Sequence, residues 1–261
     1  MLNKLLKHDL KKNMRWMWIL FASTIAVAAI TRGCKELGNT IAFFNILGIF
    51  FDSVFYALAV NALLQPFLRN FLNFKNSFYS DESYLTHTLP VTKNQLLNSK
   101  YLTALTEMLC GFACLIISIL IMFISPTFFD TIGFLLSSVL TGSFSVGLTL
   151  TLFIVLVIVE FLMFLSIIFF GIVMGYKSKD HRILKSFLIT AAMSFASLTV
   201  LAIFMIIVLL INDVSLSSKT LVLSNTAFMS VILTGIIVYS AITILFYFLT
   251  KHEFNKGVNV D

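Results

Sequence analysis

The chain has 261 residues, of which 59% are hydrophobic and only 11% are charged, and its mean hydropathy is +0.99. A soluble domain carries roughly 25% charged and about 45–50% apolar residues, so this composition excludes a soluble globular protein and makes lipid the natural solvent. The formal net charge of +6 reflects basic residues that flank apolar segments, and we do not take it as a sign of nucleic-acid binding.

Residues 1–15 are predicted to form an amphipathic helix, because leucines recur at helical spacing on one face while lysines line another. Such a helix lies in the membrane interface with its basic face toward anionic headgroups. Trp16 and Trp18 then mark the headgroup level at which the chain enters the membrane. The alternative is a simple basic flank that only enforces topology.

Six apolar runs approach or exceed the roughly 20 residues that a helix needs to cross a bilayer. The predicted spans cover about 16–31, 40–64, 101–125, 146–176, 186–211 and 226–250. The runs do not alternate polar and apolar residues as barrel strands do, which leaves helices as the structure for lipid-exposed backbone. The segment 132–140 is apolar but too short to span, so we expect an interfacial or re-entrant piece there. The fold class is therefore an all-α integral membrane protein, with the whole chain, 1–261, forming one transmembrane domain.

The distribution of basic residues predicts the orientation. With six spans, fifteen of the 18 Lys and Arg residues fall on the side that holds both termini and the loops after the second and fourth spans. The positive-inside rule therefore places both termini in the cytoplasm.

Three acidic residues lie in or at the predicted spans: Asp52, Glu107 and Glu160. A charge in mid-membrane is costly, so such residues usually face a bundle interior or a wet cavity. Glu160 is the deepest and is either a polar point in a substrate path or subunit interface, or a protonated carboxyl bonded to a neighbouring helix. Asp52 is interpreted as structural, and Glu107 is placed close to the cytoplasm and given no role.

Sequence signatures of covalent or metal chemistry are lacking. The sequence holds no G-x-x-x-x-G-K-[ST] motif for ATP phosphates, and its four histidines are scattered rather than spaced as metal ligands. Cys110 and Cys114 share a helix face and are interpreted as packing residues, and three cysteines predict no disulfide framework. We expect a non-catalytic chain that binds no metal or cofactor.

One polar stretch, 77–100, interrupts the apolar sequence and is predicted to be cytoplasmic. Asp81 and Glu82 suit the positive N-terminal end of a short helix, and Pro90 would end it. Thr92 and Gln95 then fit a capping box that opens the helix leading into the third span. The stretch is thus tied to the foot of a span, an arrangement that suits mechanical transmission.

Two segments carry a family resemblance. "YSDESYLTHTLPVTKNQLLNSKYL" resembles the first cytoplasmic loop of bacterial type-2 ABC transporter permeases, especially a Gram-positive group. "MLNKLLKHDLKKNMRW" is similar to the opening of the same permeases. The resemblance implies a six-span subunit of the bacterial cell membrane that pairs with an identical or different permease and carries two separate ATPase subunits, which use the ATP.

In such permeases the loop carries a coupling helix that fits a groove in the ATPase. The resemblance implies a coupling loop at 65–100 and six candidate coupling residues: Asp81, Glu82, Tyr84, Leu85, His87 and Leu89. It also implies an exporter, and the Phe- and Leu-rich spans suggest an apolar or amphipathic cargo such as a peptide, lipid or drug, as in the family's self-protection exporters. The alternatives are an ATP-independent secondary transporter or channel, disfavoured because the prolines lie near span ends, and a membrane-bound enzyme, disfavoured by the missing catalytic cluster.

Overall fold

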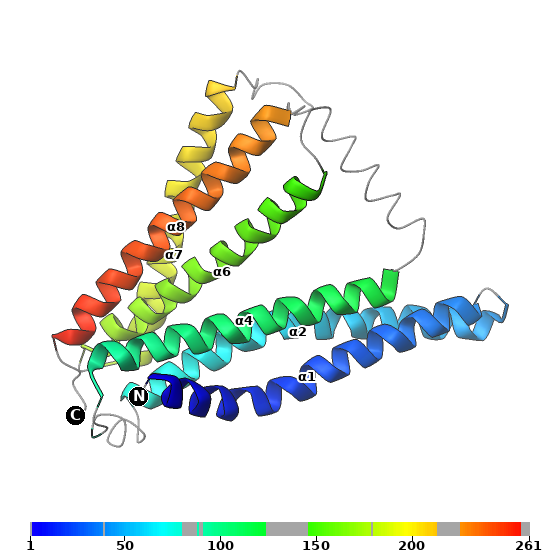
Figure 1. Cartoon of the computed structure of the whole chain (residues 1–261), viewed down its shortest axis with the longest axis horizontal. Helices are drawn as coiled ribbons and strands as arrows, with labels where there is room; N and C mark the ends of the chain where they lie inside the picture. Colours follow the sequence, from blue (N-terminus) through cyan, green and yellow to red (C-terminus); the bar gives the residue numbers. More distant parts are fainter. Residues whose placement is uncertain are drawn as a thin grey trace. The chain divides into compact units, whose positions relative to one another are not determined.

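The computed structural model describes residues 2–38, 40–79, 88, 91–123, 146–178, 180–212 and 225–256. These residues form helices and no strands, and six of the helices are long and apolar enough to cross a membrane (Figure 1). In chain order they are α1 (Leu2–Gly38), α2 (Ala42–Tyr79), α4 (Lys93–Phe123), α6 (Val146–Gly175), α7 (Arg182–Ile211) and α8 (Asn225–Asn255). The prediction of an all-helical chain with six span-length apolar helices is confirmed.

Helix α1 joins the predicted amphipathic segment to the first predicted span without a break, from Leu2 to Gly38. Within residues 4–15, leucines such as Leu6 and Leu10 are half-buried, whereas lysines such as Lys7 and Lys11 are exposed. That this segment is an amphipathic helix of the membrane interface stays a prediction.

Helix α2 runs fifteen residues beyond the end of the predicted second span at 64, to Tyr79, and passes through Pro66. The first part of the predicted loop at 65–100 is thus helical. Proline lacks the N–H that would bond to the carbonyl of Ala62, four residues earlier. A Cβ on Gly111 of α4 would lie only 3.1 Å from that carbonyl oxygen, so the glycine lets α4 approach α2 closely at this point.

Helix α4 begins where the capping box predicts. The Gln95 N–H donates to Thr92 Oγ1, and the Thr92 N–H donates to Gln95 Oε1, both at 3.4 Å. These reciprocal bonds satisfy backbone donors at the start of the helix. The candidate coupling helix, from Asp81 to Leu89, and the apolar segment 132–140 lie outside the described residues, apart from Thr88.

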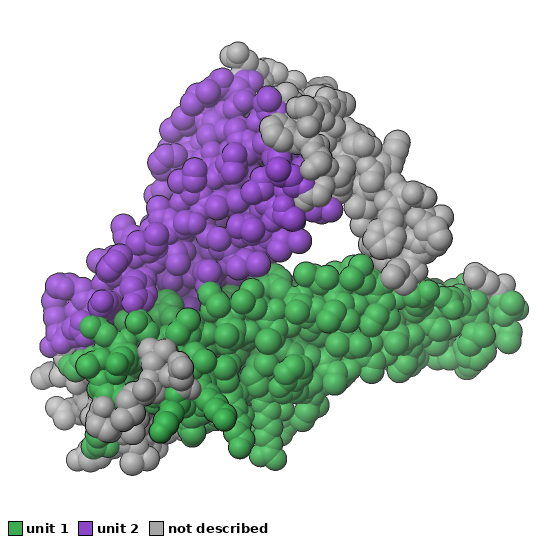
Figure 2. Space-filling view, viewed as in Figure 1, with its two compact units in different colours: residues 1–129 green, residues 130–261 purple. Residues whose placement is uncertain are grey.

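The chain divides into two compact units, Met1–Phe129 and Asp130–Asp261, coloured separately in Figure 2. In unit 1, α1 packs against both α2 and α4. Apolar contacts among its described residues include one cluster around Met17, Phe21, Ala62 and Cys114 and another around Ala28, Phe55 and Met122. In unit 2, α6 packs against both α7 and α8, and apolar contacts among the described residues include a cluster of Met163, Ile167, Phe170, Tyr239 and Phe246.

Helices α6 and α7 approach each other closely at two glycines. A Cβ on Gly171 would overlap the Thr190 hydroxyl, and a Cβ on Gly175 would overlap the backbone and hydroxyl of Ser186. Gly171 and Gly175 are four residues apart, as are Ser186 and Thr190, so each pair lies on one helix face. Small residues at this spacing allow backbones to pack closely in lipid, where no hydrophobic force drives helices together.

Candidate functional site

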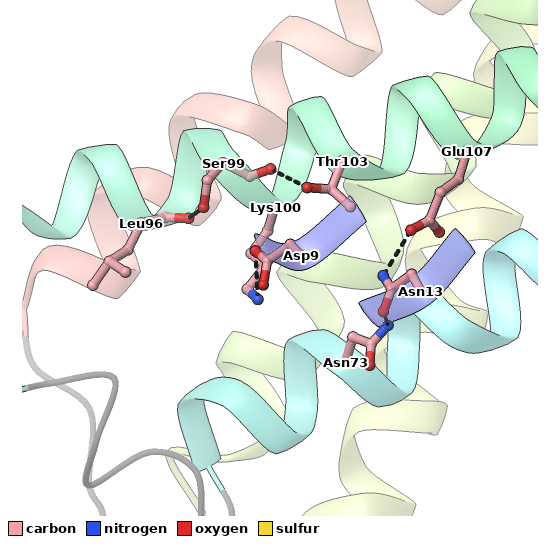
Figure 3. A network of polar contacts seen from close by, with 8 residues as sticks. All are labelled: Asp9, Asn13, Asn73, Leu96, Ser99, Lys100, Thr103 and Glu107. Atoms are coloured by element: carbon pink, nitrogen blue, oxygen red, sulfur yellow. Dashed lines mark hydrogen bonds and ion pairs between the residues drawn. The ribbon is translucent and has the colours of Figure 1, made fainter. Parts of the chain in front are cut away.

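The polar residues of unit 1 converge between three helices near the start of α4. We call this group the unit 1 polar cluster, and it contains Asp9 and Asn13 from α1, Asn70 and Asn73 from α2, and Lys100 and Glu107 from α4. Figure 3 shows most of these side chains pointing toward one another. The cluster is the main polar link among these helices in the described part of unit 1.

Glu107 is the centre of the cluster, and its side chain is fully buried. Asn13 Nδ2 donates to Glu107 Oε1 at 2.6 Å, and Asn70 Nδ2 donates to Oε2 at 3.0 Å. Asn70 Nδ2 also donates to the Pro66 carbonyl at 2.7 Å. One carboxylate thus bonds both α1 and α2 to α4, and both of its oxygens have partners, as a buried polar group requires.

A second set of contacts extends from Asn13. Asn73 Nδ2 donates to Asn13 Oδ1 at 2.6 Å (Figure 3), and Arg69 Nη1 donates to the Asn13 backbone carbonyl at 3.4 Å. Asn13 is itself only 5% exposed. Its amide therefore donates to one helix and accepts from another, which fixes its orientation and links all three helices in one network.

Two turns closer to the start of α4, Lys100 Nζ pairs with Asp9 Oδ2 at 2.9 Å, and the two side chains are 11% and 15% exposed. Ser99 and Thr103 beside it are also buried, but their hydroxyls donate to carbonyls of α4 itself, those of Leu96 and Ser99. The ion pair is thus a further link between α1 and α4, while the hydroxyls join no other helix.

Glu107 has no predicted role, because its depth in the predicted span places it close to the cytoplasm. The signal that would have found the cluster is spacing. Asp9 and Asn13 are four residues apart, Asn70 and Asn73 three apart, and Lys100 and Glu107 seven apart, so each pair lies on one face of its helix. Three helices that each present such a polar face can bury these faces only against one another.

The other two acids in the predicted spans also have partners among the described residues. Asp52 Oδ2 pairs with Lys35 Nζ at 2.9 Å, which joins the end of α1 to α2. Glu160 of α6 is half-buried and lies within side-chain hydrogen-bond reach of Tyr239 of α8. The roles of Asp52 and Glu160 stay predictions.

Among the described residues no three His, Cys, Asp or Glu side chains come together as metal ligands. Cys114 is buried in an apolar cluster that Cys110 flanks, in agreement with their interpretation as packing residues. The candidate coupling residues Asp81, Glu82, Tyr84, Leu85, His87 and Leu89 lie outside the described residues, so their role stays a prediction.

Comparisons with protein-family models, with curated proteins and with solved structures find no significant match to this chain. The class that the fold defines is a multi-pass, all-helical membrane protein with six span-length helices.

Proposed function

We propose that this chain is the membrane-spanning permease subunit of an ATP-driven ABC transporter of the bacterial cell membrane. It would work as a dimer with an identical or different permease, and two ATPase subunits would dock on the loop at 77–100. Both termini would lie in the cytoplasm, as the basic residues predict. The chain itself would bind no nucleotide and carry out no covalent chemistry.

The observation that carries this proposal is the position of the unit 1 polar cluster. Helix α4 begins at Lys93, directly after the loop that resembles a permease coupling loop. Within its first four turns α4 is bonded to α1 through Lys100 and to both α1 and α2 through Glu107.

The mechanical consequence follows from these bonds. A displacement of the loop would move the start of α4, and buried bonds of this kind resist the separation of their partners. Helices α1 and α2 would therefore move with α4. In a permease, closure of the docked ATPases upon ATP binding would supply that displacement.

The proposed cargo is apolar or amphipathic, and export is the proposed direction. Large apolar side chains are exposed along all six helices, as with Phe50 of α2 and Phe195 of α7, whose exposed fractions are 61% and 74%. Walls of this kind suit a peptide, a lipid or a drug better than a small ion, for which rings of charge or carbonyls are typical.

The test is to co-express the chain with an ABC ATPase encoded beside it, purify the complex, and measure ATP hydrolysis in vesicles. We expect the ATPase to co-purify and Tyr84→Ala with Leu85→Ala to reduce membrane-dependent hydrolysis at least tenfold. The matched control is Tyr56→Ala with Leu64→Ala, two side chains that are exposed on α2 and should leave hydrolysis unchanged.

Two results would overturn the proposal. One is that the Tyr84 and Leu85 changes leave both assembly and hydrolysis intact. The other is cargo movement by the chain alone, without nucleotide, which would favour the secondary transporter or channel.

A further inference from the structure

The α6–α7 end of unit 2 carries a groove that the proposed function does not use. The groove has a volume of about 750 Å³ and is lined by Tyr176, His181, Arg182, Ile183, Leu184 and Phe187. Its lining combines apolar side chains from the first two turns of α7 with a phenol, an imidazole and a guanidinium. We propose that this groove binds an anionic phospholipid, with the headgroup at Arg182 and the acyl chains along α7.

The position of the groove suits a lipid. The apolar helix α6 ends at Gly175 and the apolar helix α7 begins at Arg182, so the groove lies at the boundary between span-length apolar sequence and polar sequence. If these helices span a bilayer, that boundary is at the headgroup level, whichever side of the membrane it faces. Volumes of roughly 300–1,000 Å³ are typical of small-molecule sites.

Exposed apolar side chains continue along α7 beyond the groove. Among the described residues of this helix Ser186 and Ser197 are buried, whereas Phe187 and Leu188 are 69% and 55% exposed, respectively. Ile189, Met193 and Leu201 pack against the apolar cluster of unit 2. Acyl chains that start at Arg182 would therefore run along the exposed apolar side chains of the same helix.

Charge favours an anionic headgroup over a zwitterionic one. Within the described part of 176–186, Arg182 and Lys185 are basic and Asp180 is acidic, while Lys177 is paired with Glu253 of α8. Helix α7 has no acidic residue in its first turn, and His181 at its N-cap makes no side-chain capping bond. The positive end of the helix dipole adds to the same field.

The groove is held in shape by packing. Gly175 lies against the backbone of Ser186, so the last turn of α6 and the first turns of α7 cannot come closer. Lys177 contacts Glu253, and Lys185 contacts the Ser178 hydroxyl. These bonds secure the turn between the helices and its junction with α8.

The test is photo-crosslinking in vesicles that contain the full chain alone, with no ATPase or nucleotide, so its outcome is independent of the proposed function. The probes are phosphatidylglycerol and phosphatidylcholine with a diazirine near the glycerol, and the readout is labelling of the peptide that contains residues 183–188. We expect about fivefold more labelling with phosphatidylglycerol, since a basic residue near a membrane surface contributes about that factor. Arg182→Gln should remove this preference.

The matched control is Lys11→Gln, which removes one exposed positive charge from α1 and should leave labelling of the α7 peptide unchanged. Leu184→Trp should fill the groove and lower labelling by both lipids. The proposal fails if the two lipids label the peptide equally, if Arg182→Gln has no effect, or if the peptide is not labelled because another helix covers it. Loss of labelling on addition of inorganic phosphate would point to a free-anion site and would also overturn it. The lipid comparison uses the unchanged chain, so it stands even if a variant fails to fold.

Discussion

The described long helices of the two units are joined by different kinds of contact. In unit 1, side chains from α1, α2 and α4 bond to one another across the helix interfaces, with Glu107 at the centre. In unit 2, Lys177 with Glu253 and Asn212 with Ser230 also bond across helices, but these side chains are half-buried or exposed, whereas Glu107 is fully buried. There, Gly171 and Gly175 pack closely on α7, and an apolar cluster lies between α6 and α8.

The comparison illustrates the two main ways of joining helices in lipid. Helices gain little by burying apolar surface there, because lipid tails are as apolar as leucine, so association depends on close packing or on interhelical hydrogen bonds. A buried polar bond is lost when one of its partners is removed, whereas close packing at a glycine is lost when a side chain is added. Removal of a polar group should therefore destabilise unit 1, and addition of a methyl group should destabilise unit 2.

The largest effect should come from Glu107→Leu in unit 1. The change removes both acceptor atoms and leaves the amides of Asn13 and Asn70 without their buried partner. An unsatisfied buried donor costs about 1–3 kcal/mol, while side-chain hydrogen bonds in membrane proteins average about 0.6 kcal/mol, so we expect a loss of about 2–3 kcal/mol. The measurement is the free energy of unfolding in mixed micelles, followed by circular dichroism.

Two further variants test whether the loss of stability in Glu107→Leu comes from the buried hydrogen bonds. Glu107→Gln keeps the shape but turns one acceptor into a donor that faces an amide N–H, and it should cost about half as much. Glu36→Gln, at an exposed pair with Arg32, should change stability by less than about 0.5 kcal/mol. Equal effects of Glu107→Leu and Glu36→Gln would show that the network does not hold unit 1 together.

The second effect should come from Gly175→Ala in unit 2. A single Cβ there meets the Ser186 backbone, which cannot turn away as the end of a side chain could. Overpacking of this kind costs about 1–3 kcal/mol, and hydrogen exchange should rise most in α6 and α7.

The matched control is Gly33→Ala in α1, where a Cβ would meet no atom within 4 Å. Alanine is the better helix former by about 0.5–1 kcal/mol, so this variant should be neutral or slightly more stable. If both alanine variants change stability alike, helix propensity rather than close packing governs the α6–α7 contact.

Features that depend on one helix at a time could be predicted from the sequence. The six spans follow from apolar runs, and the start of α4 follows from the Thr92–Gln95 capping box. The extension of α2 through Pro66 was not predicted, because a proline inside a helix removes one backbone hydrogen bond and therefore favours a break. Glu107 was missed because its burial requires the polar faces of α1 and α2 to meet it.

The smallest effect concerns the Asp9–Lys100 pair, and it bears on the proposed function. Both side chains are largely but not fully buried, so we expect a coupling free energy of about 1 kcal/mol, between the values for exposed and buried pairs. A double-mutant cycle with Asp9→Asn and Lys100→Gln measures it. The same cycle on Asp52 and Lys35, whose lysine is 44% exposed, should give a smaller coupling that added salt reduces further.

The difference between the two coupling free energies shows whether the Asp9–Lys100 pair links α4 to α1 near the loop. Asp9 and Lys100 lie nearer the start of α4 than Glu107 does, so this pair would be the first interhelical link to receive a displacement of the loop. A coupling near zero, or one no larger than that of Asp52 and Lys35, would leave Glu107 as the described polar link between α4 and α1 that lies nearest the loop. Nearly four turns of α4 would then separate the loop from this link, and the motion relayed from the loop to α1 would be correspondingly weaker.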